Sequence, residues 1–100
     1  MSWVDREIES ILREYDRYVR NLERAYNLDS AERTYREFNR WLLNRVSRVK
    51  RARGKSEYYD EFATRVLRIA TDAHTEFRNK VEFLADLLWQ IYGDRLYDVL

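Results

Sequence analysis

Apolar residues recur at steps of three and four along nearly the whole chain, which is the spacing that keeps side chains on one face of an α-helix. In the first quarter these positions are Val4, Ile8, Ile11, Tyr15, Val19, Leu22 and Tyr26. The pattern predicts a helix over residues 3–26, with Leu12 and Tyr18 widening its apolar face. Ser2 and Asp5 have the spacing of a capping box, which marks the expected start of this helix.

A second run of the same period follows a short polar connector. Its apolar positions are Ala31, Tyr35, Phe38, Leu42, Val46 and Val49. Asp29, followed three residues later by Glu32, has the form of a helix start. The run predicts a second helix that ends at Arg53. Gly54 comes directly after it, where we expect the left-handed backbone that commonly closes a helix.

The third run is the longest. Its apolar positions are Phe62, Val66, Ile69, Ala73, Phe77, Val81, Leu84, Leu88 and Ile91. With Ser56 as its cap, it predicts a helix over residues 57–92 that reaches Gly93, about 54 Å long against about 36 Å for each of the other two helices. One solution is a three-helix bundle with an overhang, covered by the tail 94–100 or by a second copy of the chain. The alternative is a break near 71–75 and four short helices.

Composition supports an all-α fold and a single domain. The chain has 100 residues, of which 45% are hydrophobic, with two glycines and no proline. So few turn-forming residues disfavour a sheet of several strands. The sequence therefore predicts one domain over residues 1–100, an antiparallel up-down helical bundle whose third helix is long. No apolar run approaches the roughly 18 residues of a membrane span, and the chain is expected to be soluble.

The charge is unevenly distributed although the net charge is only +1. Residues 29–55 carry nine basic and three acidic side chains, whereas residues 56–100 carry five basic and nine acidic ones. The basic stretch 45–55 lies at the predicted end of the second helix, where cations face the negative helix terminus. This explanation needs no ligand and disfavours nucleic-acid binding. A single exposed ridge formed by Arg45, Arg48 and Arg51 would instead favour nucleic-acid binding.

Candidate chemistry is sparse. The chain contains no cysteine and one histidine, His74. The residues one helical turn from His74 include no good metal ligand, so we expect no metal site and no catalytic histidine. Carboxylate pairs such as Asp60–Glu61 and Glu82–Asp86 are expected to be solvated, because a hydrolytic pair needs a cleft. The sequence predicts no catalytic residue, no cofactor and no enzyme activity.

One short string resembles a natural family. Arg68 and His74 form R-x5-H, which is similar to the motif of the α-helical HEPN-type ribonucleases. The resemblance covers seven residues and implies that an arginine and a histidine of paired subunits cleave RNA. Ile69 follows Arg68, where that family usually has a polar residue.

Aromatic residues make up 15% of the chain. At helical spacing they are expected in the core and at its rim, since tyrosine and tryptophan bury a ring while the polar tip stays hydrated. Trp3, Trp41, Trp89 and Tyr92 lie near the edges of the apolar stripes. An exposed patch at these positions would indicate a partner helix or a homodimer. A homodimer through the long third helix is therefore one expectation.

In style the whole sequence resembles a computationally designed helical bundle. Helix starts, apolar periods and turn residues all agree on one fold, which is a criterion of design. The resemblance implies a stable scaffold that needs no partner and has no evolved biochemical function. The alternative is a natural helical interaction module that binds a protein or nucleic acid through the basic second helix.

Overall fold

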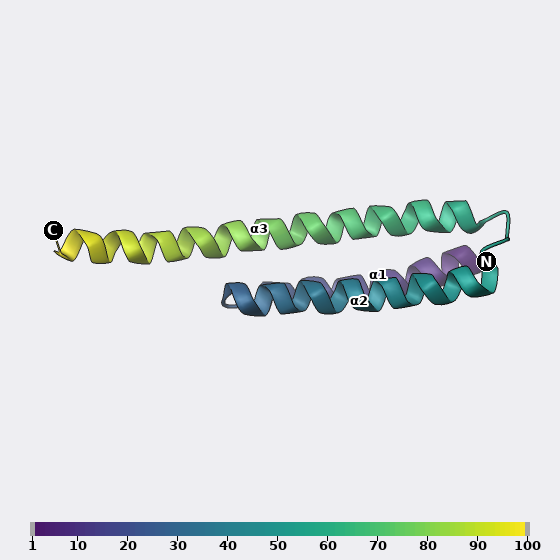
Figure 1. Cartoon of the computed structure of the whole chain (residues 1–100), viewed down its shortest axis with the longest axis horizontal. Helices are drawn as coiled ribbons and strands as arrows, with labels where there is room; N and C mark the ends of the chain where they lie inside the picture. Colours follow the sequence, from purple (N-terminus) through teal and green to yellow (C-terminus); the bar gives the residue numbers. More distant parts are fainter. Residues whose placement is uncertain (1, 100) are drawn as a thin grey trace.

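Three helices in up-down order form the molecule (Figure 1). The computed structural model describes residues 2–99. Helix α1 spans Trp3–Arg24, α2 spans Leu28–Arg53 and α3 spans Tyr59–Val99. Each helix contacts the other two, and no strand is present between residues 2 and 99. The predicted three-helix, all-α bundle with a long third helix is confirmed.

The α1–α2 turn is closed by a capping box that begins two residues earlier than the sequence suggested. Asn27 is the N-cap of α2 and not Asp29, which lies inside the first turn. The Asn27 side-chain oxygen accepts from the Ser30 backbone N–H at 2.8 Å, and the Ser30 hydroxyl accepts from the Asn27 N–H at 3.3 Å. Two otherwise free amides are satisfied in this way. The expected start at Asp29 was wrong because asparagine and serine serve as cap residues too.

The end of α2 also differs from expectation at Gly54. This glycine is right-handed, with φ −62° and ψ −15°, so the predicted left-handed conformation is wrong. Its N–H donates to the Lys50 carbonyl at 2.8 Å. A Cβ at position 54 would lie 2.5 Å from that same oxygen. Glycine therefore fits here because the backbone approaches closely, and not because φ is positive.

Helix α3 is continuous over 41 residues, so the alternative break near 71–75 is not present. The hydroxyls there bond within the helix. Thr71 donates to the Leu67 carbonyl at 2.9 Å, and Thr75 donates to the Thr71 carbonyl at 3.1 Å. The helix also passes through Gly93, contrary to expectation, and ends at Val99. The tail therefore extends the overhang and does not fold back to cover it; residue 100 lies outside the described part.

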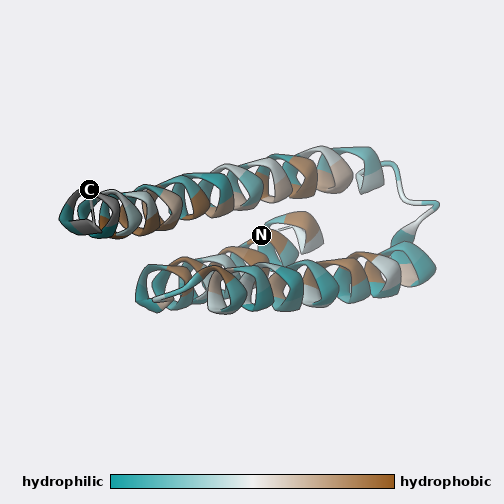
Figure 2. Cartoon of the chain, turned by 60° about the vertical axis from the view of Figure 1, so that its left-hand side comes forward, coloured by the Kyte–Doolittle hydropathy of each residue, from teal (hydrophilic) through white to brown (hydrophobic). Residues whose placement is uncertain are grey.

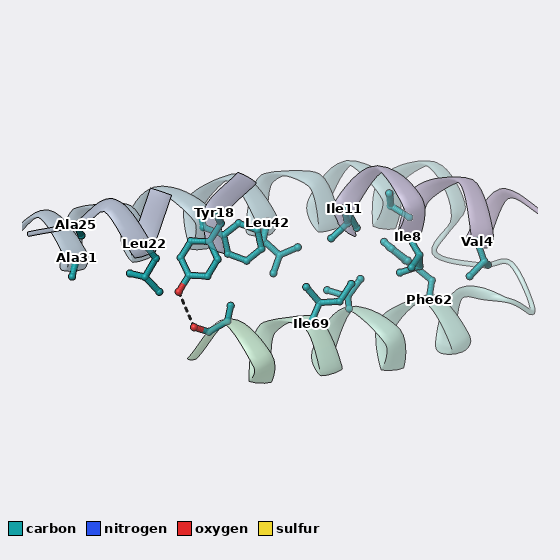
Figure 3. Packing of buried hydrophobic residues seen from close by; sticks show 14 of the residues in the cluster. Val4, Ile8, Ile11, Tyr18, Leu22, Ala25, Ala31, Leu42, Phe62 and Ile69 are labelled. Carbon is teal, nitrogen blue, oxygen red and sulfur yellow. Dashed lines mark hydrogen bonds between the residues drawn. The ribbon is translucent and has the colours of Figure 1, made fainter. Parts of the chain in front are cut away.

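The core is one apolar cluster between the α1–α2 hairpin and the first two thirds of α3 (Figure 3). Its buried members are Val4, Ile8, Ile11, Tyr18, Leu22, Ala25, Ala31, Phe38, Leu42, Val49, Phe62, Val66, Ile69, Ala73 and Leu84. Most were predicted from the period. Leu12, predicted to widen the apolar face of α1, is exposed. Three positions of the predicted core stripes, Tyr26, Leu88 and Ile91, are exposed too. Each lies at or beyond the α1–α2 turn, where no neighbouring helix remains to cover it.

A layer of aromatic rings joins the three helices near the middle of the core. Tyr18 of α1 stacks on Phe38 of α2 at 4.6 Å between ring centroids, and Tyr35 of α2 stacks on Phe77 of α3 at 4.3 Å. The Tyr18 hydroxyl donates to the Ala73 carbonyl of α3 at 2.7 Å (Figure 3). Burial raises the pKa of this phenol far above its usual range. The buried polar tip of Tyr18 is thus satisfied by the opposite helix.

We predict that Tyr18→Phe lowers the free energy of unfolding by about 1 kcal/mol, because one buried hydrogen bond is lost while the ring remains. Urea unfolding followed by circular dichroism at one protein concentration measures the change. Tyr26→Phe is the matched control, since Tyr26 is 82% exposed, and it should leave stability unchanged. Equal effects of the two substitutions would contradict the assigned role of the Tyr18 hydroxyl.

Candidate interaction surface

His74 lies on the exposed side of α3 beside a tyrosine. The distance between its Nδ1 and the Tyr35 hydroxyl oxygen is 3.1 Å, and the two rings are 6.1 Å apart. Arg68, six residues earlier, is also exposed. Six residues turn an α-helix by about 240°, so Arg68 and His74 of one chain point to different sides. Within one chain, the structure does not bring the two residues of the R-x5-H string together.

The basic stretch at the end of α2 divides into two groups. Arg45 contacts Glu7 at 3.2 Å and Ser10 at 3.0 Å, both on α1, and its guanidinium lies 4.9 Å from the centre of the Trp41 ring. Arg53 lies equally close to the Trp3 ring. The exposed basic residues of the stretch include Arg53 as well as Arg48, Lys50, Arg51 and Lys55. Arg45 therefore belongs to the packing of the bundle. Arg45, Arg48 and Arg51 do not form the single exposed ridge that would have favoured nucleic-acid binding.

Asp5 and Glu7 of α1 pair with basic residues of the other two helices. Asp5 accepts from Arg65 of α3 at 2.9 Å, and this hydrogen bond holds the pKa of the Asp5 carboxyl below its usual value. The predicted carboxylate pairs Asp60–Glu61 and Glu82–Asp86 lie on exposed positions. Across residues 2–99, no group of three histidine or acidic residues is placed to hold a metal ion. No helix in the described part of the chain is long and apolar enough to cross a membrane.

An unusual surface of exposed apolar side chains lies at the end of the molecule where α3 extends past the α1–α2 turn. Among the residues of α3 whose burial is described, Leu84 is the last buried one, and the helix continues to Val99 beyond the α1–α2 turn (Figures 1 and 2). We call residues 85–99 the projecting end of α3. Large apolar side chains remain exposed on it and on the adjacent turn. This distal surface comprises Tyr26, Leu28, Phe83, Leu87, Leu88, Trp89, Ile91 and Tyr92.

The projecting end carries two neighbouring apolar stripes. Leu84, Leu88 and Ile91 continue the core stripe, while Ala85, Trp89 and Tyr92 form a second one at the same steps of four and three. A helix that packs on one neighbour needs an apolar stripe about 100° wide. Two adjacent stripes exceed that width. The sequence of the projecting end is therefore suited to burial against more than one element.

A hollow of about 180 Å³ lies where the projecting end leaves the bundle. Its lining comes from both sides of this junction, namely Tyr26, Asn27 and Leu28 of the turn and Leu84, Leu87, Leu88 and Ile91 of α3. The only polar side chains among these are those of Tyr26 and Asn27. Such a lining suits apolar side chains of a partner more than a reacting substrate.

Charge around the distal surface is predominantly acidic. Glu82, Asp86, Asp94 and Asp98 are exposed, and the basic residues of this region are Lys80 and Arg95. Lys80 Nζ donates to the Glu23 carbonyl near the end of α1 at 2.9 Å and lies 5.6 Å from the centre of the Phe83 ring. Lys80 thus fastens α3 to α1 just before the helix becomes free.

Comparison with known proteins adds no relative: no family model matches the sequence, and neither a curated protein nor a solved structure is significantly similar to it.

Sequence reasoning located part of this surface. Trp89 and Tyr92 were predicted at a stripe edge, where exposure would indicate a partner, and both are exposed. Trp3 and Trp41, expected to behave alike, are instead half-buried against the core. The role of Tyr26 was missed because its period matches the core stripe of α1. Its place after Arg24, the last residue of α1, was the missing information.

We predict that His74→Ala does not change the rate at which the purified chain cleaves a labelled single-stranded RNA. The reason is that His74 bonds to Tyr35 and that no nucleophile and acid are placed beside it. Gel analysis of the cleavage products measures the rate. Thr75→Ala is the control, and a loss of cleavage specific to His74→Ala would contradict the prediction.

Proposed function

We propose that this chain is a non-enzymatic helical interaction module. The bundle formed by α1, α2 and the first part of α3 acts as the scaffold. The projecting end of α3 and the α1–α2 turn form the docking surface for a protein partner. The observation that supports the proposal most directly is the exposure of Trp89, at 74%, among neighbouring apolar side chains on a well-formed helix.

The size of the distal surface supports a docking role. Its eight residues are each 38–82% exposed, and with roughly 150–250 Å² for each aromatic side chain their exposed area, summed over all sides of the projecting end and the turn, is on the order of 900 Å². A monomeric protein rarely exposes an apolar patch above about 600 Å². A surface of this extent marks an interaction site, because leaving it in water costs free energy that association recovers.

The charge pattern favours a protein partner over a lipid surface. Helices that lie on membranes carry mainly lysine and arginine on the polar face. The projecting end carries Asp86, Asp94 and Asp98 with Arg95 as its one basic residue. Anionic lipid headgroups would repel these carboxylates.

Nucleic-acid binding through α2 is the second candidate. It is favoured by four exposed cations close together in sequence, namely Arg48, Lys50, Arg51 and Lys55. It is weakened by the engagement of Arg45 with Glu7 and of Arg53 with Trp3. Affinity for DNA or RNA that falls steeply with salt would identify this function.

We also propose that the chain originated by computational design, as its style suggests. The caps at Ser2 and Asn27 and the unbroken period of the core support this proposal. An exposed distal surface is compatible with it if the designed unit includes a partner. An idealised bundle of this kind is expected to be a stable scaffold.

Under the design hypothesis we predict a thermal unfolding midpoint above ~90 °C, the usual threshold for hyperstability. Circular dichroism at 222 nm during heating measures the midpoint. A single cooperative transition near 50 °C, as in ordinary proteins of moderate-temperature organisms, would contradict the hypothesis.

For the docking surface, we predict that Ile91→Glu sharply reduces binding of the apolar dye 8-anilinonaphthalene-1-sulfonate to the diluted chain. The substitution places a charge in the middle of the distal surface, where Ile91 is 53% exposed. Leu67→Glu is the matched control, since Leu67 is 67% exposed on the bundle part of the same helix. Dye fluorescence is measured in a dilution series to below 1 μM. Equal dye binding by wild type and Ile91→Glu at every dilution would contradict the proposed docking surface.

A further inference from the structure

The partner of the distal surface can be named from its geometry. We propose that it is a second copy of this chain, bound so that the two projecting ends run antiparallel around a twofold axis. This inference rests on the proposed docking function and identifies its occupant. In this dimer the projecting end of each copy lies against that of the other and reaches toward the other's α1–α2 turn.

The distal surface has the size and shape that a twofold dimer requires. A standard interface buries about 800 Å² on each partner, and the distal surface offers on the order of 900 Å². A twofold interface requires that the same patch cover itself. The distal surface meets this requirement, because each copy presents a helix with two apolar stripes and a turn carrying Tyr26 and Leu28. The partner helix can cover one stripe, and the partner's turn can cover part of the other.

The length of the projecting end matches the span between the two hollows of such a dimer. Asp98 lies fourteen positions beyond Leu84, which is about 21 Å along the helix. Leu84 lines the same hollow as Leu28 of the turn. When two projecting ends overlap fully in opposite directions, the tip of each therefore reaches the hollow of the other. The partner's helix then closes the hollow, and the projecting ends of both copies become buried when the dimer forms.

The charges along α3 favour the antiparallel direction over the parallel one. Lys80, Leu87 and Asp94 are spaced by seven residues and share one edge of α3, with Asp98 close to the same edge. A twofold axis perpendicular to the helix pair places this edge of one copy against the same edge of the other copy, with the two helices running in opposite directions. Lys80 of each copy then lies about 6 Å along the helix axis from the level of Asp98 of the other copy, while its Nζ still donates to the Glu23 carbonyl of its own chain. A parallel pair would instead gather the carboxylates of both copies at one end, where they repel.

Solution mass tests the dimer. The chain has a mass of 12.4 kDa, and sedimentation equilibrium of the wild type should give twice this value at tens of micromolar. Ile91→Glu should raise the dissociation constant at least ~100-fold, because both copies then bury a carboxylate. The same variant should therefore sediment as a monomer. Leu67→Glu, outside the distal surface, should remain a dimer.

Engineered cysteines test the direction, since the chain contains no cysteine of its own. We expect the double variant Leu28→Cys/Asp98→Cys to form a disulfide-linked dimer on mild oxidation. Within one copy these positions are too far apart to bridge, because a disulfide needs Cα atoms within about 7 Å. Each single variant should remain unlinked. Rapid linkage of Asp98→Cys alone would show parallel tips and overturn the proposed arrangement.

The outcomes separate this inference from the docking function. A wild-type mass of 12.4 kDa at every concentration would overturn the homodimer. If dye binding then still depended on Ile91, the docking surface would stand and its partner would be a different protein. If the mass were monomeric and the dye did not distinguish Ile91→Glu, both proposals would fall. Circular dichroism checks that each variant is folded. The substitution at Ile91 should not disturb the core, because Ile91 lies outside it.

Discussion

The structure depends on a mismatch in length between α3 and the two helices that cover it. A helix of 41 residues is about 61 Å long, whereas α1 and α2 have 22 and 26 residues and reach about 33 and 39 Å. The hairpin can therefore bury the core stripe of α3 only as far as Leu84. Beyond that point the same period continues past the α1–α2 turn, which covers Leu87, Leu88 and Ile91 only in part. The elongated shape, 66 by 21 by 17 Å, follows from this one constraint.

Within the covered part, a few directional contacts fix how the helices sit against each other. Apolar burial supplies most of the driving force but has no direction. The Tyr18 hydroxyl on the Ala73 carbonyl and the pairing of Arg45 with Glu7 supply direction. They join α1 to α3 and α1 to α2, respectively. Lys80 on the Glu23 carbonyl adds a last contact between α1 and α3 before the helix leaves the bundle.

The bundle itself offers little chemistry and the projecting end offers a surface. His74, the one histidine, bonds to Tyr35, and the exposed carboxylates are spread over solvated faces. By contrast, Leu88, Trp89 and Ile91 are held in place by a continuous helix that is anchored in the core. A rigid helix presents such side chains with little loss of conformational entropy on binding, which favours association.

The sequence alone determined the helical class and most of the core, and it predicted three helices with a four-helix alternative that the continuous α3 excludes. Those properties depend on local spacing, and steps of three and four residues are sufficient to define an apolar face. The expected helix ends were wrong at two places: Asn27 and not Asp29 caps α2, and α3 passes through Gly93. A cap depends on which of several competent side chains meets the free amides, and spacing does not decide that.

Only the tertiary structure decided which apolar residues are buried. Leu84 and Leu88 are equivalent in the period, yet one is buried and the other exposed. Burial requires a neighbour, and the position of the α1–α2 turn sets where neighbours end. The sequence therefore defined the apolar face of α3 along its length, and the packing of the three helices decided which part of that face stays open to a partner.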